Sequence, residues 1–174
     1  MQPTDFLRDV QQFFERLEAR IEERVEEGGK ELGKMVAANM DGNSSGGFNS
    51  GTRLGSVSGR LRQAWEGGSG SVFRLQSLPY PEAEVGVDTN EIPYAVIHEY
   101  GGKIQATPRM IGKLFHLAKE TGEDRYRITA LSARKKGFVN IPARPAVAPA
   151  TEQFERELPS RIRDIEADAG QLWG

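Results

Sequence analysis

The stretch "NIPARPAVAPA", from Asn140 to Ala150, decides how this chain is expected to fold. From Ile141 onward, four of its ten residues are alanine and three are proline, with neither glycine nor serine among them. It can be read as a linker, as a proline-rich ligand for another protein, or as a rigid joint inside a fold. A flexible linker is disfavoured because such segments are rich in glycine and serine. The ligand interpretation rests only on "PARP", a short match to P-x-x-P.

The flanking segments favour a rigid strand-to-helix joint. The strand-like "GFVNI" leads into the stretch, and a strongly patterned helix follows it. Pro142 and Pro145 restrict the backbone where the strand ends, and Pro149 suits the first turn of the helix. We expect the planar guanidinium of Arg144 to bind a carboxylate, either Glu99 or an acidic residue of a neighbouring subunit.

Both ends of the chain are predicted to be helical. Over residues 1–40, apolar side chains recur at three- and four-residue spacing, and the stripe resumes after Gly28–Gly29. This pattern fits one helix of about 35 residues capped by Thr4, or two shorter helices broken at the glycine pair. The glutamate-rich segment around these glycines is expected to be solvated on most faces. The apolar stripe of the C-terminal helix crosses Pro159, which predicts a kink or a new helix there.

Between these helices the sequence predicts a small, mainly antiparallel sheet. Residues 41–57 are rich in glycine, serine and asparagine and are predicted to form a flexible loop. The other predicted elements are a short helix at 58–65 capped by Ser58, strands at 71–78 and 82–88, a short helical or irregular run at 93–102, a helix at 107–122, and strands at 125–131 and 137–141. The last two strands would form a hairpin with the basic tip "SARKKG".

The order of elements predicts a single α+β domain over residues 1–174. Its core would comprise 58–102 and 137–174, with the C-terminal helix packed on the sheet and residues 103–136 as a basic insertion. The low apolar content, 37%, predicts a small core that neighbouring subunits complete.

Composition limits the class of protein. The chain has no cysteine, so disulfides and thiol catalysis are excluded, and a cytoplasmic site of synthesis fits. No apolar run approaches the roughly 20 residues of a membrane span, and the N-terminus lacks the apolar region of a signal peptide. The net charge of −2 hides an asymmetry: residues 1–40 and 151–174 each carry −3, whereas 103–136 carries +6.

The basic insertion is a candidate nucleic-acid interface. The residues that would face DNA are Arg125, Arg127, Arg134, Lys135 and Lys136. Such contacts to phosphates would be independent of base sequence and sensitive to salt. A solvated surface, or one that docks on the acidic helices of a neighbouring copy, is the favoured alternative. Only Tyr126 is interleaved with these charges to stack on bases.

No pattern in the sequence predicts an active site. "GNSSG" at 42–46 matches a hydrolase nucleophile motif around Ser44, but that motif needs a strand before the serine and a helix after it. His98–Glu99 begins like a zinc-protease helix and lacks the second histidine at the required spacing. We interpret His98 and His116 as structural, and we predict no catalytic residue, metal site or cofactor.

Three stretches together resemble tailed-phage neck and tail-completion proteins, the virion-morphogenesis family. They are "SGRLRQAW" (58–65), "VGVDTNEIPYAVIHEYGG" (85–102) and "IPARPAVAPATEQF" (141–154), in the order found in that family. The residues that match its pattern are Gly59, Leu61, Tyr94, Ala95, His98, Glu99, Gly101, Pro142, Arg144 and Pro145. Ala146 departs from the usual bulky residue after the second proline, and Phe154 is expected to fill the gap.

The resemblance implies a non-enzymatic virion protein. Its copies would form a homo-oligomeric ring at the head–tail junction, around the DNA channel, after assembly in the cytoplasm of a bacterial host. Implied partners are portal or head–tail connector proteins on one side and tail terminator or tail tube proteins on the other, with sequence-independent contact to packaged DNA. The residues implied in structural motifs or subunit interfaces are Tyr94, His98, Glu99, Gly101, Pro142, Arg144 and Pro145.

Overall fold

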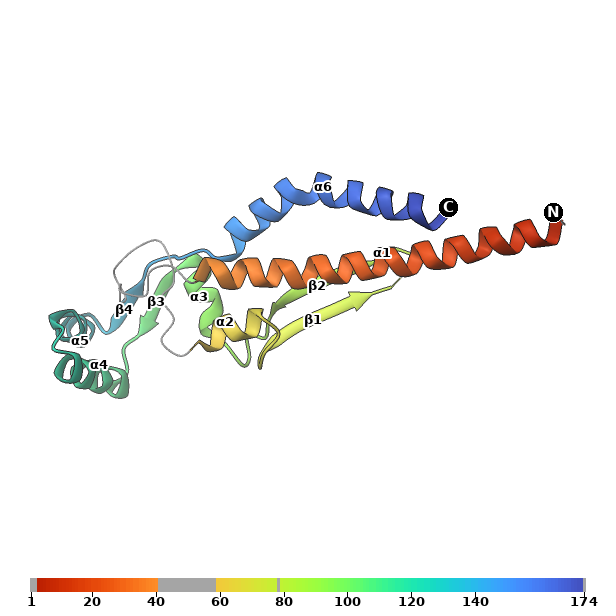
Figure 1. Cartoon of the computed structure of the whole chain (residues 1–174). Coiled ribbons are helices and arrows are strands. Elements are labelled where there is room, and N and C mark those ends of the chain that lie inside the picture. The colour runs from red at the N-terminus through yellow and green to blue at the C-terminus, as the bar shows by residue number, and fades with distance from the viewer. Residues whose placement is uncertain (1–2, 41–58, 78, 174) are drawn as a thin grey trace.

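The chain is built around two long helices, to which two small sheets and a helical hairpin are attached (Figure 1). The computed structural model describes residues 3–40, 59–77 and 79–173, so the predicted loop at 41–57 lies outside the described residues. The helices are α1 (Pro3–Met40), α2 (Arg60–Trp65), α3 (Tyr94–Tyr100), α4 (Pro108–Thr121), α5 (Asp124–Lys136) and α6 (Val147–Trp173). The strands are β1 (Ser71–Gln76), β2 (Glu82–Val87), β3 (Gly102–Gln105) and β4 (Phe138–Ile141). The predicted α+β class is confirmed.

Helix α1 is a single helix of 38 residues, about 57 Å long. It does not break at Gly28–Gly29, because its glycines are packing positions. A β-carbon at Gly29 would lie 2.8 Å from the β-carbon of Ala83, and one at Gly33 would lie 2.6 Å from the carbonyl oxygen of Trp65. Bare backbone at these positions lets β2 and α2 approach α1 directly. The glycine pair is therefore buried, and the prediction of a largely solvated segment was wrong there.

The first sheet is the hairpin β1–β2, whose strands were predicted to within two residues. Ser71 lies opposite Val87 and Gln76 opposite Glu82. Helix α2 precedes the hairpin, and its N-cap is Gly59 with a φ of 70°, whereas the predicted cap Ser58 lies outside the described residues.

The second sheet pairs β3 with β4 and carries the helical hairpin α4–α5 between its strands. The predicted basic β-hairpin at 125–141 was wrong, because residues 124–136 form α5 and β4 pairs with β3 instead. The β-forming residues of "RYRITAL" are overridden by helix signals on either side. Asp124 lies in the first turn, the basic residues lie in the last turn, and Gly137 ends the helix with a φ of 78°. Burial of Ala130 and Ala133 completes the packing of α5.

Helix α6 runs along α1 as one helix of 27 residues, with Pro159 inside it. Figure 1 shows that α6 bends partway along its length. A bend rather than a break is expected where proline removes one hydrogen bond from a helix that packing holds in place. Pro149 lies in the first turn, as predicted.

Close packing and ion pairs fix α6 against α1. Nitrogen atoms of Arg20 and Arg24 lie 3.0 and 2.8 Å from the carboxylate of Asp168, and Arg161 Nη1 lies 2.7 Å from Glu31 Oε2. The ring of Phe154 lies 3.3 Å from where a β-carbon at Gly28 would be, and the rings of Phe13 and Trp173 meet edge to face with centroids 4.7 Å apart.

The principal core lies where the C-terminal end of α1, helix α2 and the start of α6 meet. Its buried members are Val36, Met40, Leu61, Ala64, Ile92, Ala146 and Ala150. A second, smaller cluster joins α5 to β4. The N-terminal part of α1 extends beyond the end of α6 (Figure 1). No helix in the described part of the chain is long and apolar enough to cross a membrane.

Candidate functional site

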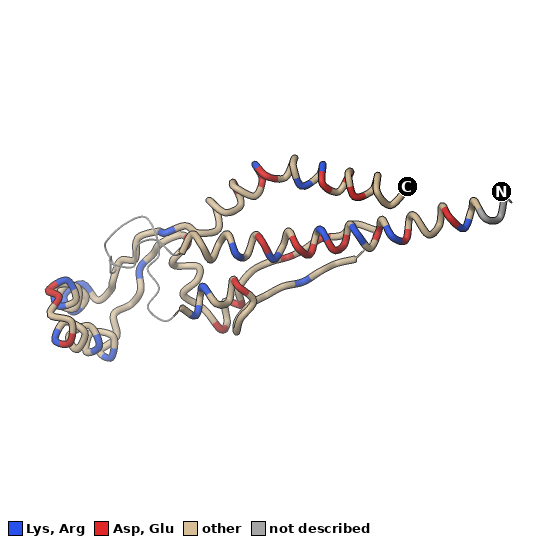
Figure 2. The backbone as a smooth tube through the Cα atoms, viewed as in Figure 1, with Lys and Arg blue, Asp and Glu red and all other residues tan. Residues whose placement is uncertain are grey.

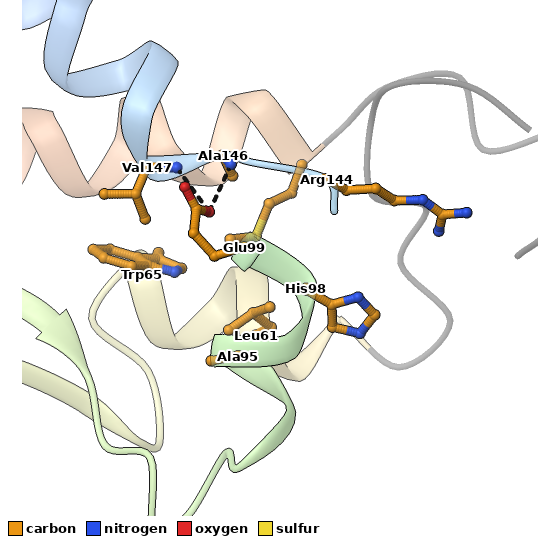
Figure 3. A pocket seen from close by; sticks show the side chains of 9 residues that line it. Leu61, Trp65, Ala95, His98, Glu99, Arg144, Ala146 and Val147 are labelled. Atoms are coloured by element: carbon orange, nitrogen blue, oxygen red, sulfur yellow. Dashed lines mark hydrogen bonds between the residues drawn. The ribbon is translucent and has the colours of Figure 1, made fainter. Parts of the chain in front are cut away.

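The three sequence stretches that resemble the phage family come together at the start of α6. We call this place the α3–α6 joint and define it by Glu99, Gly101, Arg144 and Ala146. Its elements are the last turn of α3 and the segment between β4 and α6 (Figure 3). Helix α2 and the end of α1 complete it, through side chains that include Trp65.

Glu99 caps α6 from another element of the fold. Its Oε2 atom accepts hydrogen bonds from the backbone nitrogens of Ala146 at 2.8 Å and Val147 at 3.2 Å, and Oε1 accepts one from Ala148 at 3.3 Å. The first N–H groups of a helix have no partner within the helix and carry partial positive charge. A carboxylate at this point satisfies them, so it fixes where α6 starts and in which direction it leaves the joint.

Gly101 allows α3 to end against the same segment. It has a φ of 71°, and a β-carbon there would lie 2.7 Å from the nitrogen of Ala143 and 3.0 Å from the carbonyl oxygen of Ile141. Glycine alone adopts this conformation without strain and leaves room for the neighbouring backbone. One residue beyond Ala143, the N–H of Arg144 donates to the carbonyl oxygen of His98 at 2.7 Å. The predicted rigid joint is therefore held by backbone contacts to α3.

Arg144 does not bind Glu99, the first of its two predicted partners. The residue is buried, with 5% of its surface exposed, but its side chain points away from the Glu99 carboxylate (Figure 3). The backbone N–H groups of α6 are nearer to Glu99 and occupy the carboxylate instead. The backbone N–H of Arg144 binds α3, while its side chain extends away from Glu99.

His98 lines the cavity of the joint. It is half-buried, and its ring meets that of Tyr94 edge to face with centroids 5.8 Å apart. Burial, and secondarily the positive charge of Arg144, lower the pKa of His98, so the ring is neutral near pH 7. A neutral histidine at this position avoids placing a second positive charge beside Arg144.

A small, partly open cavity lies at the joint. Its volume is about 30 Å³, room for about two water molecules. The lining residues are Met40, Leu61, Trp65, Ala95, His98, Glu99, Arg144, Ala146 and Val147. Phe154 was expected to fill the space beside Ala146, but it does not. Its ring packs on Gly28 and lies under the guanidinium of Arg161 instead. Pro142 and Pro145 lie exposed on either side of Arg144.

The five predicted DNA-facing residues, Arg125, Arg127, Arg134, Lys135 and Lys136, all lie on α5, away from the joint (Figure 2). Two of them are engaged locally: Arg125 pairs with Glu123, and Arg127 pairs with Asp124 at 3.3 Å. The remaining three, Arg134 to Lys136, are exposed in the last turn of the helix. Their charge is favourable at a helix C-terminus, so part of their role is to stabilise α5 itself.

The other candidate residues are not brought together. Ser44 lies outside the described residues. His116 is exposed on α4, with its Nε2 atom 3.1 Å from Glu120. Within residues 3–40, 59–77 and 79–173, no three histidine, aspartate or glutamate side chains are grouped so that they could hold a metal ion.

Comparison with known proteins adds no relative. The chain matches no protein-family model, no curated protein and no solved structure.

Sequence reasoning missed the role of Glu99 as a cap and the contribution of Met40 to the joint. A capping box would have revealed a cap within a few residues of its helix, but Glu99 is 47 residues away from Ala146. Met40 belongs to the apolar stripe of α1, and that pattern predicts burial without naming the partner.

Proposed function

We propose that the chain is a structural subunit of the neck of a tailed phage, forming a homo-oligomeric ring at the head–tail junction. The observation that carries this proposal is the meeting of three family-like stretches at one joint, where Glu99, Gly101 and Arg144 fix the start of α6. In this proposal the matching residues serve the shape of the subunit, because Glu99 binds the first N–H groups of α6 and the backbone of Arg144 binds α3.

The proposed location sets the partners. The ring surrounds the DNA channel, with portal or head–tail connector proteins on one side and tail terminator or tail tube proteins on the other. The chain carries surface suited to such contacts, because Phe6, Leu7 and Phe14 are exposed in the N-terminal part of α1. Large apolar residues grouped on a surface are typical of protein interfaces.

Imaging of the assembled protein tests the proposal. We expect closed rings of the purified protein by electron microscopy and mass photometry, and density for the chain in the neck of phage particles. Glu99→Gln, which weakens the joint, should lower the yield of rings, whereas Glu18→Gln on the exposed surface of α1 should not. A chain that stays monomeric and is absent from particles would contradict the proposal.

A second candidate function is nucleic-acid binding through α5. The exposed run Arg134 to Lys136 favours it, because neighbouring cations on one helix end suit a phosphate backbone. Binding to duplex DNA that falls steeply with salt and is lost on charge reversal of these three residues would support this function. Salt-independent binding, or none, would exclude it. The two functions are compatible where α5 faces the channel of a ring.

A further inference from the structure

Helix α5 carries an exposed face that is apolar in its middle and basic at its C-terminal end, with Asp124, paired to Arg127, at the other end. Ile128 and Leu131 are 62% and 51% exposed, although they are large apolar residues. At three- and four-residue spacing, Lys135 continues the same side of the helix and Arg134 lies next to it. Within the described part of the chain, neither Arg134 nor Lys135 forms an ion pair. We call Ile128, Leu131, Arg134 and Lys135 the α5 face.

Helix α6 carries a face of the opposite charge. Leu158 and Ile162 are 43% and 49% exposed, and Glu155 and Glu166 lie on the same side of the helix, one before and one after this apolar pair. Both glutamates are exposed and form no ion pair with another described residue. We call Glu155, Leu158, Ile162 and Glu166 the α6 face.

The two faces are complementary in both apolar surface and charge. Each has two adjacent apolar side chains, and the basic end of the α5 face can meet an acidic residue of the α6 face whichever way the helices run. Burial of the apolar pairs would supply affinity, and the charges would set partner and register. A solvated surface explains the charges but leaves four large apolar residues exposed without a partner.

The two faces of one chain lie apart, since α5 is at one end of the molecule and α6 runs along α1 (Figure 1). A contact between them therefore joins two different copies. We propose that the α5 face of one copy docks on the α6 face of a second copy. Such a contact is heterologous, and it builds closed rings or open filaments according to the rotation between subunits. The proposal supplies the contact between subunits that the proposed neck ring requires, and for ring closure it rests on that function.

A second copy fits the α5 face better than nucleic acid does. Ile128 and Leu131 occupy the middle of the face, and a phosphate backbone offers them no apolar surface. The α6 face offers an apolar surface for Ile128 and Leu131 and acidic residues for Arg134 and Lys135. A phosphate backbone would contact only the basic residues.

Charge-swap complementation tests the contact. Variant X carries Arg134→Glu and Lys135→Glu, and variant Y carries Glu155→Lys and Glu166→Lys. Each alone brings like charges together, so its self-association should weaken by at least about tenfold relative to the wild type, measured by mass photometry and sedimentation. When X and Y are mixed, every contact between an X copy and a Y copy again joins opposite charges, and assembly in which the two alternate should return. Recovery of assembly in the mixture also shows that both variants are folded.

A matched control separates the α5 face from general charge effects. Lys113→Glu with Lys119→Glu changes the net charge as X does, on exposed positions of the neighbouring helix α4. This control should assemble like the wild type.

Several outcomes would overturn the contact. They are a mixture of X and Y that fails to assemble, a control as weakened as X, a wild-type chain that is monomeric, and an X variant that loses affinity for duplex DNA while assembling normally. Assembly restored in the mixture, with the chain absent from phage particles, would support the contact and contradict the neck function.

Discussion

The Oε2 atom of Glu99 lies 2.8 Å from the backbone nitrogen of Ala146, so a carboxylate at the end of α3 caps the start of α6. The two residues are 47 positions apart in sequence, and the whole α4–α5 hairpin lies between them. The direction of α6 therefore depends on the docking of α3, a helix of seven residues. This contact makes the joint testable by substitution.

Loss of the charge on Glu99 should destabilise the fold. Glu99→Gln keeps one acceptor oxygen but loses the charge that favours the helix N-terminus, so we expect the free energy of unfolding to fall by about 1–2 kcal/mol. Urea unfolding followed by circular dichroism measures this change. Glu18→Gln, on the exposed surface of α1, should change stability by less than about 0.5 kcal/mol. Equal effects of the two substitutions would refute the capping role.

Alanine should have opposite effects at different helical glycines. Gly33→Ala places a β-carbon 2.6 Å from the carbonyl oxygen of Trp65, and overpacking against backbone should cost about 1–3 kcal/mol. At Gly170 in α6 a β-carbon meets nothing within 4 Å, so Gly170→Ala should stabilise by about 0.5–1 kcal/mol. Thermal and urea unfolding of both variants compare the signs. Stabilisation by Gly33→Ala would show that α2 and α1 are not in close contact.

The contribution of Asp168 to stability should be complete above about pH 4 and should be lost as the pH falls further. Hydrogen bonds from Arg24, and then from Arg20, lower the pKa of Asp168 in the folded chain. A carboxylate with a lowered folded-state pKa stabilises the fold above its unfolded pKa, and the contribution is lost as pH falls through the folded value. Asp168→Asn should therefore reduce the melting temperature at pH 7 and bring it closer to that of the wild type at pH 3. An identical difference at both pH values would contradict this assignment.

His98 should make the fold sensitive to pH just below 6.5. Burial, and then Arg144, lower the pKa of His98, so the unfolded chain takes up a proton first as pH falls. Stability is then complete above the unfolded value near pH 6.5 and declines as pH falls toward the folded value. His98→Gln should flatten the stability profile in this window, and the imidazole resonances of the wild type should report a midpoint below 6.5. A midpoint at or above 6.5 would be inconsistent with the buried position.

Several elements followed from local sequence signals. The apolar stripes predicted α1 and α6, the helix predicted at 107–122 matches α4, and the strands predicted at 71–78 and 82–88 match β1 and β2. Each of these sequence patterns depends on residues within a turn or two of one another, so it can be recognised without knowing which distant segments pack together.

The segment 125–136 shows where local preference fails. Its tyrosine, isoleucine and threonine favour a strand, and β4 immediately follows it. The chain forms α5 instead, because Ala130 and Ala133 bury a narrow helix face and β4 finds its partner in β3, outside the segment. The local sequence pattern does not indicate that β3 and β4 pair, because these strands are more than thirty residues apart.

The sequence by itself determined the α+β class, the two long helices and the position of the proline-rich joint. The tertiary structure decided that the Glu99 carboxylate binds the N-terminus of α6 rather than the side chain of Arg144. It also decided that Gly29 packs against β2 instead of breaking α1. Propensity, capping and φ restrictions act between neighbours along the chain. Hydrogen bonds to a helix end and close backbone packing depend on which distant segments meet, and only the folded arrangement specifies that.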